Sequence, residues 1–249
     1  MREGQKEAEI RELRSIAELR EAEALQIAVW GQGDKPDNAD IMLAIQHEGG
    51  LVAGAFVNGR MLGFIFAFPT SEAGVQHSHR LAVHPDTQGM GLGTKLKWYQ
   101  RDWCLKHDIE LVRWTFDPLR RVNANLNIAK LGATVGVYHE DYYGEMGGIN
   151  AGVPSDRLVA EWRIGAGETG AGETGGKKSG PDTDQKECRR VAIPVDFETM
   201  VRCAPDEALS ERLRVRAILT LAFADGFRIT GFDAAHNQYL LTAARAFSE

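Results

Sequence analysis

The chain has 249 residues, a length that suits one large domain or two modest ones. Hydrophobic residues make up 43%, enough for a buried core, so a wholly disordered protein is excluded. The net charge of −6, from 29 Lys and Arg against 35 Asp and Glu, argues against nucleic-acid binding, which needs a basic surface.

The first 70 residues predict a strand, two helices and a hairpin, at 10–13, 15–31, 40–46 and 51–68. Ser15 and Glu18 have the spacing of a capping box, so the first helix is expected to begin there. Asn58-Gly59 is the dipeptide preferred in two-residue hairpin turns, and it divides the long apolar stretch into two strands. That division argues against a membrane span.

The middle of the chain alternates strands and helices. Strands are predicted at 75–83, 110–116, 134–139 and 158–164, and helices at 94–107 and 121–131. Proline cannot extend a strand ladder, so we expect a β-bulge or bend near His84-Pro85.

A change of composition begins at residue 165. Residues 165–186 repeat the sequence GAGET and read as a flexible Gly-rich linker. The segment does not match a phosphate-binding P-loop, because Ala171 stands at the first glycine position and Lys178 where Ser or Thr is required. Residues 187–249 then predict a β-α-β-β extension, which is too short for a large core and should pack on the first domain.

The three cysteines, Cys104, Cys188 and Cys203, are widely spaced and odd in number. Their spacing matches neither a disulfide framework nor a zinc site, so no metal is expected. Such cysteine usage suits the reducing cytoplasm, and the N-terminus has no apolar segment typical of a signal peptide.

The segment most informative about chemistry is LAVHPDTQGMGLGTKL at 81–96. A strand ends, glycines turn the chain, and a helix starts at once. Backbone N–H groups without helical partners then converge at a positive helix terminus, which is a site for a phosphate or pyrophosphate. A dinucleotide-binding motif is excluded, because Thr94 stands where its third glycine or alanine is needed.

Gln88, Gly91 and Gly93 fill the places of (R/Q)-x-x-G-x-(G/A), and the segment resembles the acyl-CoA signature of the GNAT superfamily of N-acyltransferases. Later segments are similar to a branch of predicted acetyltransferases with a C-terminal extension, so the resemblance covers nearly the whole chain. These segments are Thr115–Leu119, Asn123-Ala124, Asn127, Lys130–Ala133, Tyr142–Met146 and Pro154–Leu158.

The resemblance implies an α/β fold in which helices flank a mixed, mostly antiparallel central sheet. The acyltransferase core would span 1–164, with the small β-α-β-β extension at 187–249. The implied cofactor is acetyl-CoA or another acyl-CoA, with pantetheine along strand 75–83 where it splays from strand 110–116. The residues implied to bind it are Leu81, Ala82, Val83, Gln88, Gly89, Met90, Gly91, Leu92, Gly93, Thr94 and Asn123.

Two histidines are candidates for a general base. An aliphatic amine is protonated at neutral pH, so its attack on a thioester needs a base. Histidine titrates near neutral pH and therefore suits this role. Strand alternation places His77 and His79 on one face. The segment is similar to serotonin N-acetyltransferases, in which two histidines of this strand serve the base. His79 is the first choice for the base and His77 the second; the alternative for each is a structural role. His84 is expected to be structural.

The general acid is left open. Many GNAT enzymes place a tyrosine four residues before the glycine that ends the second helix, but here that position is Ile128. Tyr143 or Tyr142 could protonate the leaving thiolate, or the thiolate could leave unassisted, since its conjugate acid has a pKa of about 8.5. Arg80, Arg113 and Arg120 are candidates for binding an acceptor carboxylate, although a role as a surface or structural cation is favoured for each.

The sequence therefore predicts a CoA-dependent N-acyltransferase that moves an acetyl or short acyl group, such as succinyl, to a primary amine of a small molecule. The alternative is a module that binds CoA or acyl-CoA as a sensor without turnover. Neither nucleic acid nor a membrane is an expected partner. The C-terminal extension either covers the acceptor cleft or pairs two subunits into a homodimer.

Overall fold

The computed structural model describes residues 7–33, 35–87, 90–145, 152–165 and 188–243. They divide into two compact units. The first contains the described residues of 1–114 together with Glu145, and the second those of 115–144 and 152–249. No helix in the described ranges is both long and apolar enough to cross a membrane.

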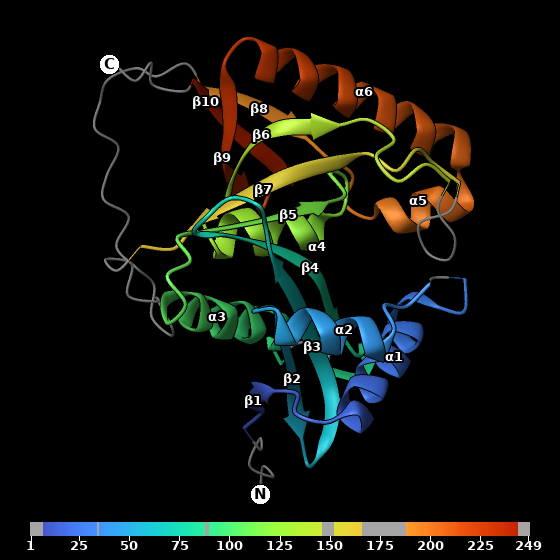
Figure 1. The fold of residues 1–249 in the computed structure, drawn as a ribbon. Coiled ribbons are helices and arrows are strands. Elements are labelled where there is room, and N and C mark those ends of the chain that lie inside the picture. The colour runs from blue at the N-terminus through green and yellow to red at the C-terminus, as the bar shows by residue number, and fades with distance from the viewer. Residues whose placement is uncertain (1–6, 34, 88–89, 146–151, 166–187, 244–249) are drawn as a thin grey trace, which may run out of the picture. The chain divides into compact units, whose positions relative to one another are not determined.

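The first unit contains five strands in chain order across its sheet, β1–β2–β3–β4–β5 (Figure 1). All neighbours are antiparallel except β4 and β5, which are parallel. Its elements are β1 (Glu9–Glu12), α1 (Ile16–Trp30), α2 (Ala39–His47), β2 (Leu51–Val57), β3 (Arg60–Pro69), β4 (Val75–Val83), η1 (Pro85–Thr87) and α3 (Leu92–Leu105), followed by β5 (Leu111–Phe116), whose last two residues belong to the second unit.

Local sequence signals explain several of these boundaries. The Ser15 side chain accepts a hydrogen bond from the Glu18 backbone N–H at 3.2 Å, which confirms the predicted cap of α1. Asn58 and Gly59 both have positive φ, 54° and 76°, as a tight hairpin turn requires. Helix α3 begins two residues earlier than predicted, because Gly91 takes the left-handed conformation (φ 67°) and completes the turn before Leu92.

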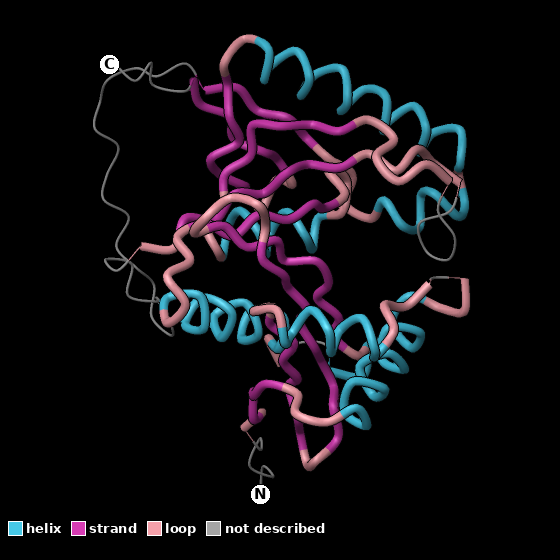
Figure 2. The backbone as a smooth tube through the Cα atoms, viewed as in Figure 1, coloured by secondary structure: helices cyan, strands magenta, loops and turns pink. Residues whose placement is uncertain are grey.

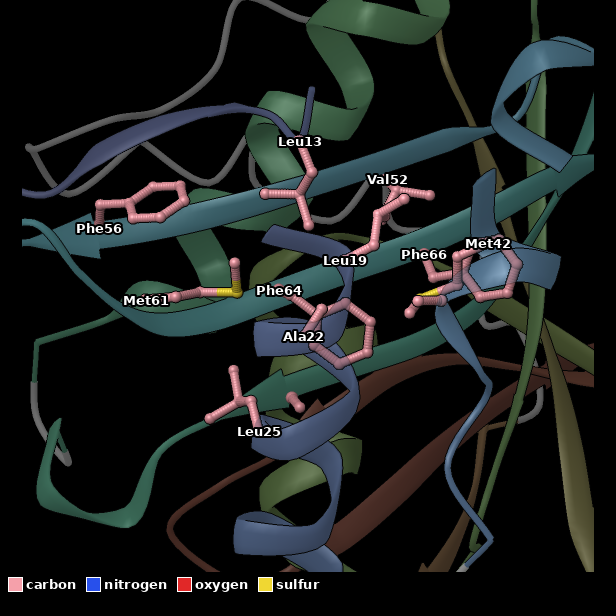
Figure 3. Packing of buried hydrophobic residues seen from close by; sticks show 12 residues of the cluster. Leu13, Leu19, Ala22, Leu25, Met42, Val52, Phe56, Met61, Phe64 and Phe66 are labelled. Atoms are coloured by element: carbon pink, nitrogen blue, oxygen red, sulfur yellow. The ribbon is translucent and has the colours of Figure 1, made fainter. Parts of the chain in front are cut away.

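Helices cover both faces of the sheet in the first unit. Phe64 and Phe66 of β3 belong to a buried cluster with α1, α2 and β2, and Figure 3 shows these side chains packed between helix and strands. On the opposite face, a Cβ built on Gly63 would lie 3.1 Å from Leu96 of α3. Alternation along β3 thus directs successive residues to different helices. This explains why the strand is apolar on both faces, as the sequence suggested.

The second unit has the strand order β7–β6–β9–β10–β8. β9 pairs with β6 through Ile229 and Val135, so the C-terminal strands extend the sheet that β6 and β7 begin. Figure 2 shows α6 lying along these strands. The elements are α4 (Arg121–Ala124), η2 (Asn125–Lys130), β6 (Thr134–His139), β7 (Arg157–Arg163), β8 (Cys188–Ala192), α5 (Phe197–Cys203), α6 (Pro205–Ala224), β9 (Phe227–Asp233) and β10 (Gln238–Ala243).

The predicted architecture, a mixed sheet of mostly antiparallel strands flanked by helices, is confirmed. The extension differs in detail, because α5 lies between β8 and α6 and was not predicted. Asp196 caps α5 by accepting from the Thr199 N–H at 3.0 Å. The second predicted core helix is also irregular, since residues 125–130 form a π-helix in which the Leu131 N–H donates to the Leu126 carbonyl at 3.0 Å.

A buried ion pair ties α6 to the turn after β5. Arg212 donates to both carboxylate oxygens of Asp117, at 2.9 and 2.7 Å, and only 1% of its side chain is exposed. Asp117 also accepts from the Leu119 N–H at 2.8 Å. Burial opposes ionisation of the Asp117 carboxyl, but Arg212 outweighs that effect and holds its pKa below the usual value. The second unit therefore combines residues of the predicted core and of the C-terminal extension.

Candidate active site

The turn between β4 and α3 is the first component of the site. The Thr87 hydroxyl donates to the His84 carbonyl at 2.7 Å, and the Met90 N–H donates to the Thr87 carbonyl at 3.1 Å. Gln88 and Gly89, predicted to bind CoA, lie outside the described residues. Gly91 follows in the left-handed conformation, where any residue with a Cβ would be strained.

The first turn of α3 is suited to an anion. Its first helical hydrogen bond runs from the Lys95 N–H to the Gly91 carbonyl, so the N–H groups of Leu92, Gly93 and Thr94 precede the helical ladder. Among the described residues, no side chain caps this end, and the first turn contains no acidic residue. A diphosphate fits these observations, because free N–H groups and the positive helix end both favour negative charge.

Within the first unit, strands β4 and β5 pair over three residues and then separate. Their parallel ladder pairs Val75 with Leu111, Gln76 with Val112 and His77 with Arg113. β4 then continues to Val83, paired on its other side with β3. The edge of β4 that faces away from β3 is therefore unpaired by β5 beyond His77. This agrees with the predicted splay and leaves the segment Leu81–Val83 with one edge available for a ligand.

A β-bulge lies in β4 at His79; near His84-Pro85, where a bulge or bend was predicted, β4 ends and the chain bends into η1. The register with β3 shifts so that Phe66 pairs with Arg80 and Ala67 with Ser78. The ladder continues to the end of the strand, where the His84 N–H donates to the Leu62 carbonyl at 2.8 Å. Proline does end the ladder, and the chain turns there into η1; the irregularity, however, arises where an extra residue enters β4.

The bulge brings two consecutive side chains to one carboxylate. Nε2 of His79 lies 3.4 Å from Oδ1 of Asp37, and Nε of Arg80 lies 3.1 Å from Oδ2. In a regular strand, adjacent side chains point to opposite faces, so the bulge explains their shared partner. Burial opposes ionisation of Asp37, but His79 and Arg80 outweigh it and hold the pKa of the carboxyl below its usual value. A carboxylate on imidazole fixes the ring orientation and supports proton transfer.

His77 lies on the same face in a less polar environment. Its ring stacks on Phe68 with a centroid distance of 5.0 Å and lies 6.1 Å from the His79 ring. Burial lowers the pKa of His77 to about 4, with further repulsion from His79, Lys97 and Arg113. His77 is therefore neutral at physiological pH. The expected sharing of one face by the two histidines is confirmed by their ring contact.

The tyrosines and Asn123 belong to the second unit. Tyr143 shares a hydrogen bond with Thr115 at 3.1 Å between the two hydroxyl oxygens, and the Tyr142 ring stacks on His139 at 4.8 Å. Ile128 is buried at 3% exposure in the π-helix and has no proton to donate. Asn123 is the third residue of α4 and half-buried; Arg120 occupies the N-cap, so Asn123 does not cap the helix.

The arginines considered for an acceptor carboxylate already contact carboxylates of the protein. Arg80 pairs with Asp37, Arg113 lies 2.5 Å from Glu72, and Arg120 lies 3.4 Å from Glu198. These contacts favour the alternative role as structural cations. In the described part of the chain, no three residues among His, Cys, Asp and Glu are grouped to hold a metal ion.

Two residues of interest were missed by sequence reasoning. Asp37 follows Pro36 in a loop, and nothing local distinguishes it from an ordinary loop aspartate. Lys97 could have been recognised from the sequence, because it falls on the buried face of α3, next to Leu96 and one turn before Gln100. A charged residue on the buried stripe of a helix is uncommon and indicates a specific local partner.

Residues 13–129 match the family model described as "Acetyltransferase (GNAT) family". No curated protein matches the chain in sequence. Among solved structures, the Escherichia coli ribosomal-protein-S18-alanine N-acetyltransferase is 19% identical with a TM-score of 0.53, covering 65% of this chain and 99% of its own. An aminoglycoside 6'-acetyltransferase type Ii is 17% identical with a TM-score of 0.52, covering 63% and 97%.

A GNAT superfamily phosphinothricin acetyltransferase from Sinorhizobium meliloti, solved in complex with AcCoA, is 15% identical with a TM-score of 0.50, covering 71% and 97%. At these identities the structures establish a shared fold alone, and the names of these three enzymes point to different acceptors. The resemblance expected from the sequence is confirmed, and with it acetyl-CoA as the family's cofactor. Residues 13–129 thus match the GNAT acetyltransferase family model, and the fold is one that solved GNAT structures share.

Proposed function

We propose that the protein transfers an acetyl group, or a short acyl group such as succinyl, from acyl-CoA to a primary amine of a small molecule. The observation that carries this proposal is the arrangement of β4. β4 places His79 against Asp37, and the chain continues from β4 through η1 and the glycine turn to the N-terminal end of α3. A candidate base and a candidate diphosphate site thus lie close together along the chain.

The cofactor site follows from this arrangement. The N–H groups of Leu92, Gly93 and Thr94 would hold the pyrophosphate, together with Gln88, Gly89, Met90 and Gly91 of the preceding turn. The unpaired edge of Leu81, Ala82 and Val83 would pair with the pantetheine amides as an added strand does. Asn123 would donate a hydrogen bond to CoA. Acetyl-CoA supplies the thioester carbonyl that the amine attacks.

His79 would remove one proton from the acceptor ammonium group, directly or through one water, to give the neutral amine. The amine nitrogen then attacks the thioester carbon, the C–N bond forms as the C–S bond breaks, and the thiolate leaves with the electron pair of that bond. The second proton that the nitrogen loses goes to the thiolate or to solvent. Asp37 would orient the ring and stabilise its protonated form, since its carboxyl pKa is held low by His79 and Arg80. His77 is the second choice, because a group with a pKa of about 4 is a weak base at neutral pH.

The thiolate would leave unassisted or receive a proton from Tyr143 or Tyr142. The unassisted route is supported by Ile128, which stands where many family members have a tyrosine. A thiol of pKa near 8.5 is an adequate leaving group, so the reaction does not require a strong acid. Tyr143 is the better of the two tyrosines, because Thr115 fixes its hydroxyl by a hydrogen bond.

We further propose that residues 1–164 form the catalytic core, 165–186 the linker and 187–249 the extension, and that the protein acts in the cytoplasm, either as a monomer or as a homodimer.

Thiol release tests the proposed function. Purified protein is mixed with acetyl-CoA or succinyl-CoA and a panel of primary amines, and free CoA thiol is followed. Calorimetry with CoA measures binding independently. Thiol release that depends on an amine supports the transferase. Binding of CoA without amine-dependent release of thiol would favour the sensor instead, and no binding of CoA would overturn both.

A further inference from the structure

Lys97 is the most unusual side chain in the first unit that the proposed chemistry does not use. It lies in the middle of α3, and only 2% of the residue is exposed. Its Nζ donates to the Ser78 hydroxyl at 2.8 Å and to Gln100 Oε1 at 3.1 Å, and it lies 3.8 Å from the centre of the Trp114 ring. Hydrogen bonds and a cation–π contact thus replace the water that the ammonium group has lost.

The contacts of Lys97 coincide with the point where β4 and β5 separate. The last pair of the parallel ladder is His77 with Arg113. Ser78 is the next residue of β4, and Trp114 is the next residue of β5. The Lys97 ammonium group therefore bridges the two strands one residue beyond their last pairing, at the apex of the fork that they form.

The described contacts of Lys97 satisfy its hydrogen-bonding capacity but do not balance its charge. Apart from Ser78 and Trp114, the groups around it are Gln100 and Cys104 of α3 and Gln76 of β4, and none of them carries a negative charge to balance the ammonium group. Nε2 of Gln76 is buried with no hydrogen-bond partner in the described structure. A buried donor left without an acceptor destabilises a fold by about 1–3 kcal/mol.

Burial also changes the proton affinity of the group. It lowers the pKa of Lys97 to about 7, so the residue changes charge within the neutral range. Burial likewise raises the pKa of the neighbouring Cys104 thiol to about 12, which leaves that group neutral. On the other face of β4, His77 is repelled by Lys97 and is itself neutral at pH 7. Lys97 is therefore the group in this network whose charge changes near neutral pH.

We propose that Lys97 is a positioning residue of the acyl-CoA site: its ammonium group bridges Ser78 and Trp114 and sets the separation of β4 and β5 where they fork. This inference rests on the proposed function, which places the pantetheine arm along the edge of Leu81–Val83 that β4 leaves unpaired by β5 beyond this fork. Lys97 would act through the two strands and not by contact with the reacting atoms.

The test compares Lys97→Met and Ser78→Ala with the wild type. Lys106→Met serves as a matched control, because Lys106 lies exposed at the end of the same helix. Calorimetry measures the Kd of CoA, thermal unfolding gives Tm, and thiol release gives KM and kcat. We expect Lys97→Met to keep or raise Tm, since it removes a buried charge, while the Kd of CoA and the KM of acetyl-CoA rise about 10-fold and kcat changes little.

A dependence on pH separates positioning from a purely structural role. The difference in Kd between wild type and Lys97→Met should be large at pH 6 and shrink by pH 9, because deprotonation removes the charge from the wild-type protein. Ser78→Ala should weaken CoA binding in the same direction, about 3-fold. Unchanged affinity in either variant, or a loss in Lys97→Met that is equal at both pH values, would overturn the proposal. Failure of the wild type itself to bind CoA would instead refute the proposed function.

Discussion

The substitution His79→Ala tests the proposed base most directly. A positioned general base contributes about 10²–10⁴-fold to a rate, which corresponds to about 3–5 kcal/mol of transition-state stabilisation. The His79 side chain is 30% exposed, and its contact with Asp37 is long at 3.4 Å. Water can therefore replace part of its action, and we expect a loss in kcat/KM near the lower limit, about 10²-fold.

The pH dependence gives this prediction a second readout. Because an aliphatic amine loses its own proton at a pKa of about 10, the need for a base falls as pH rises. The rate of thiol release by His79→Ala should thus be furthest below the wild-type rate at pH 7 and should approach it near pH 9.5. The Kd of CoA, measured by calorimetry, should stay unchanged, because the variant leaves the α3 terminus intact.

Two comparison variants make the result specific. His47→Ala removes an exposed histidine at the end of α2 and should behave like the wild type. His77→Ala removes the stacked histidine and should reduce the rate less than His79→Ala. A kcat/KM for His79→Ala within 3-fold of wild type at pH 7 would refute the assignment, and a larger loss in His77→Ala would transfer the role to that residue.

Three further substitutions probe the surroundings. Carboxylates that orient functional histidines are worth about 10–100-fold in metal sites; Asp37→Asn should lower the rate of thiol release within this range, and an unchanged rate would exclude an orienting role. Gly91→Ala and the control Gly132→Ala each place a Cβ on a residue in the left-handed conformation with open space around it. Both variants should therefore lose about 1–2 kcal/mol of the free energy of unfolding measured with denaturant. Only Gly91→Ala should weaken CoA binding in calorimetry. Arg212→Met leaves a buried carboxylate unpaired and should destabilise the protein by about 3–5 kcal/mol, whereas adding Asp117→Asn should restore part of that loss; equal stability of single and double variants would contradict this account.

Asp117 also predicts a response to acid. Its carboxyl pKa is lower in the folded protein than in the unfolded chain, so the unfolded chain binds the proton more tightly. The stability that the ion pair provides is therefore present above the ordinary carboxyl pKa of about 3.9 and is lost as pH falls through the folded-state value. Urea unfolding of the wild type between pH 7 and pH 3 should show this loss, and the variant with both substitutions should show less of it.

Short-range patterns predicted much of the fold. Ser15 with Glu18 marks a helix start, Asn58-Gly59 marks a hairpin, and alternating apolar residues mark the strands, because each of these signals depends on neighbours within a few residues. The glycine-rich segment likewise predicted that a helix follows, although α3 starts two residues earlier than expected. Helix α5 was missed because it is a single short helix of seven residues, for which apolar periodicity is a weak signal.

The candidate site depended on contacts that no local pattern contains. His79 meets Asp37 from 42 residues earlier only because a bulge enters β4, and the register of that strand is decided by its pairing with β3. Lys97 was placed beneath the fork by the packing of α3 on β4. Arg212 reached Asp117 across 95 residues of chain. From sequence alone, the chain revealed its elements, its glycine turn and its family resemblance; tertiary structure decided which charges and rings meet, because burial and strand register are properties of the whole packed unit.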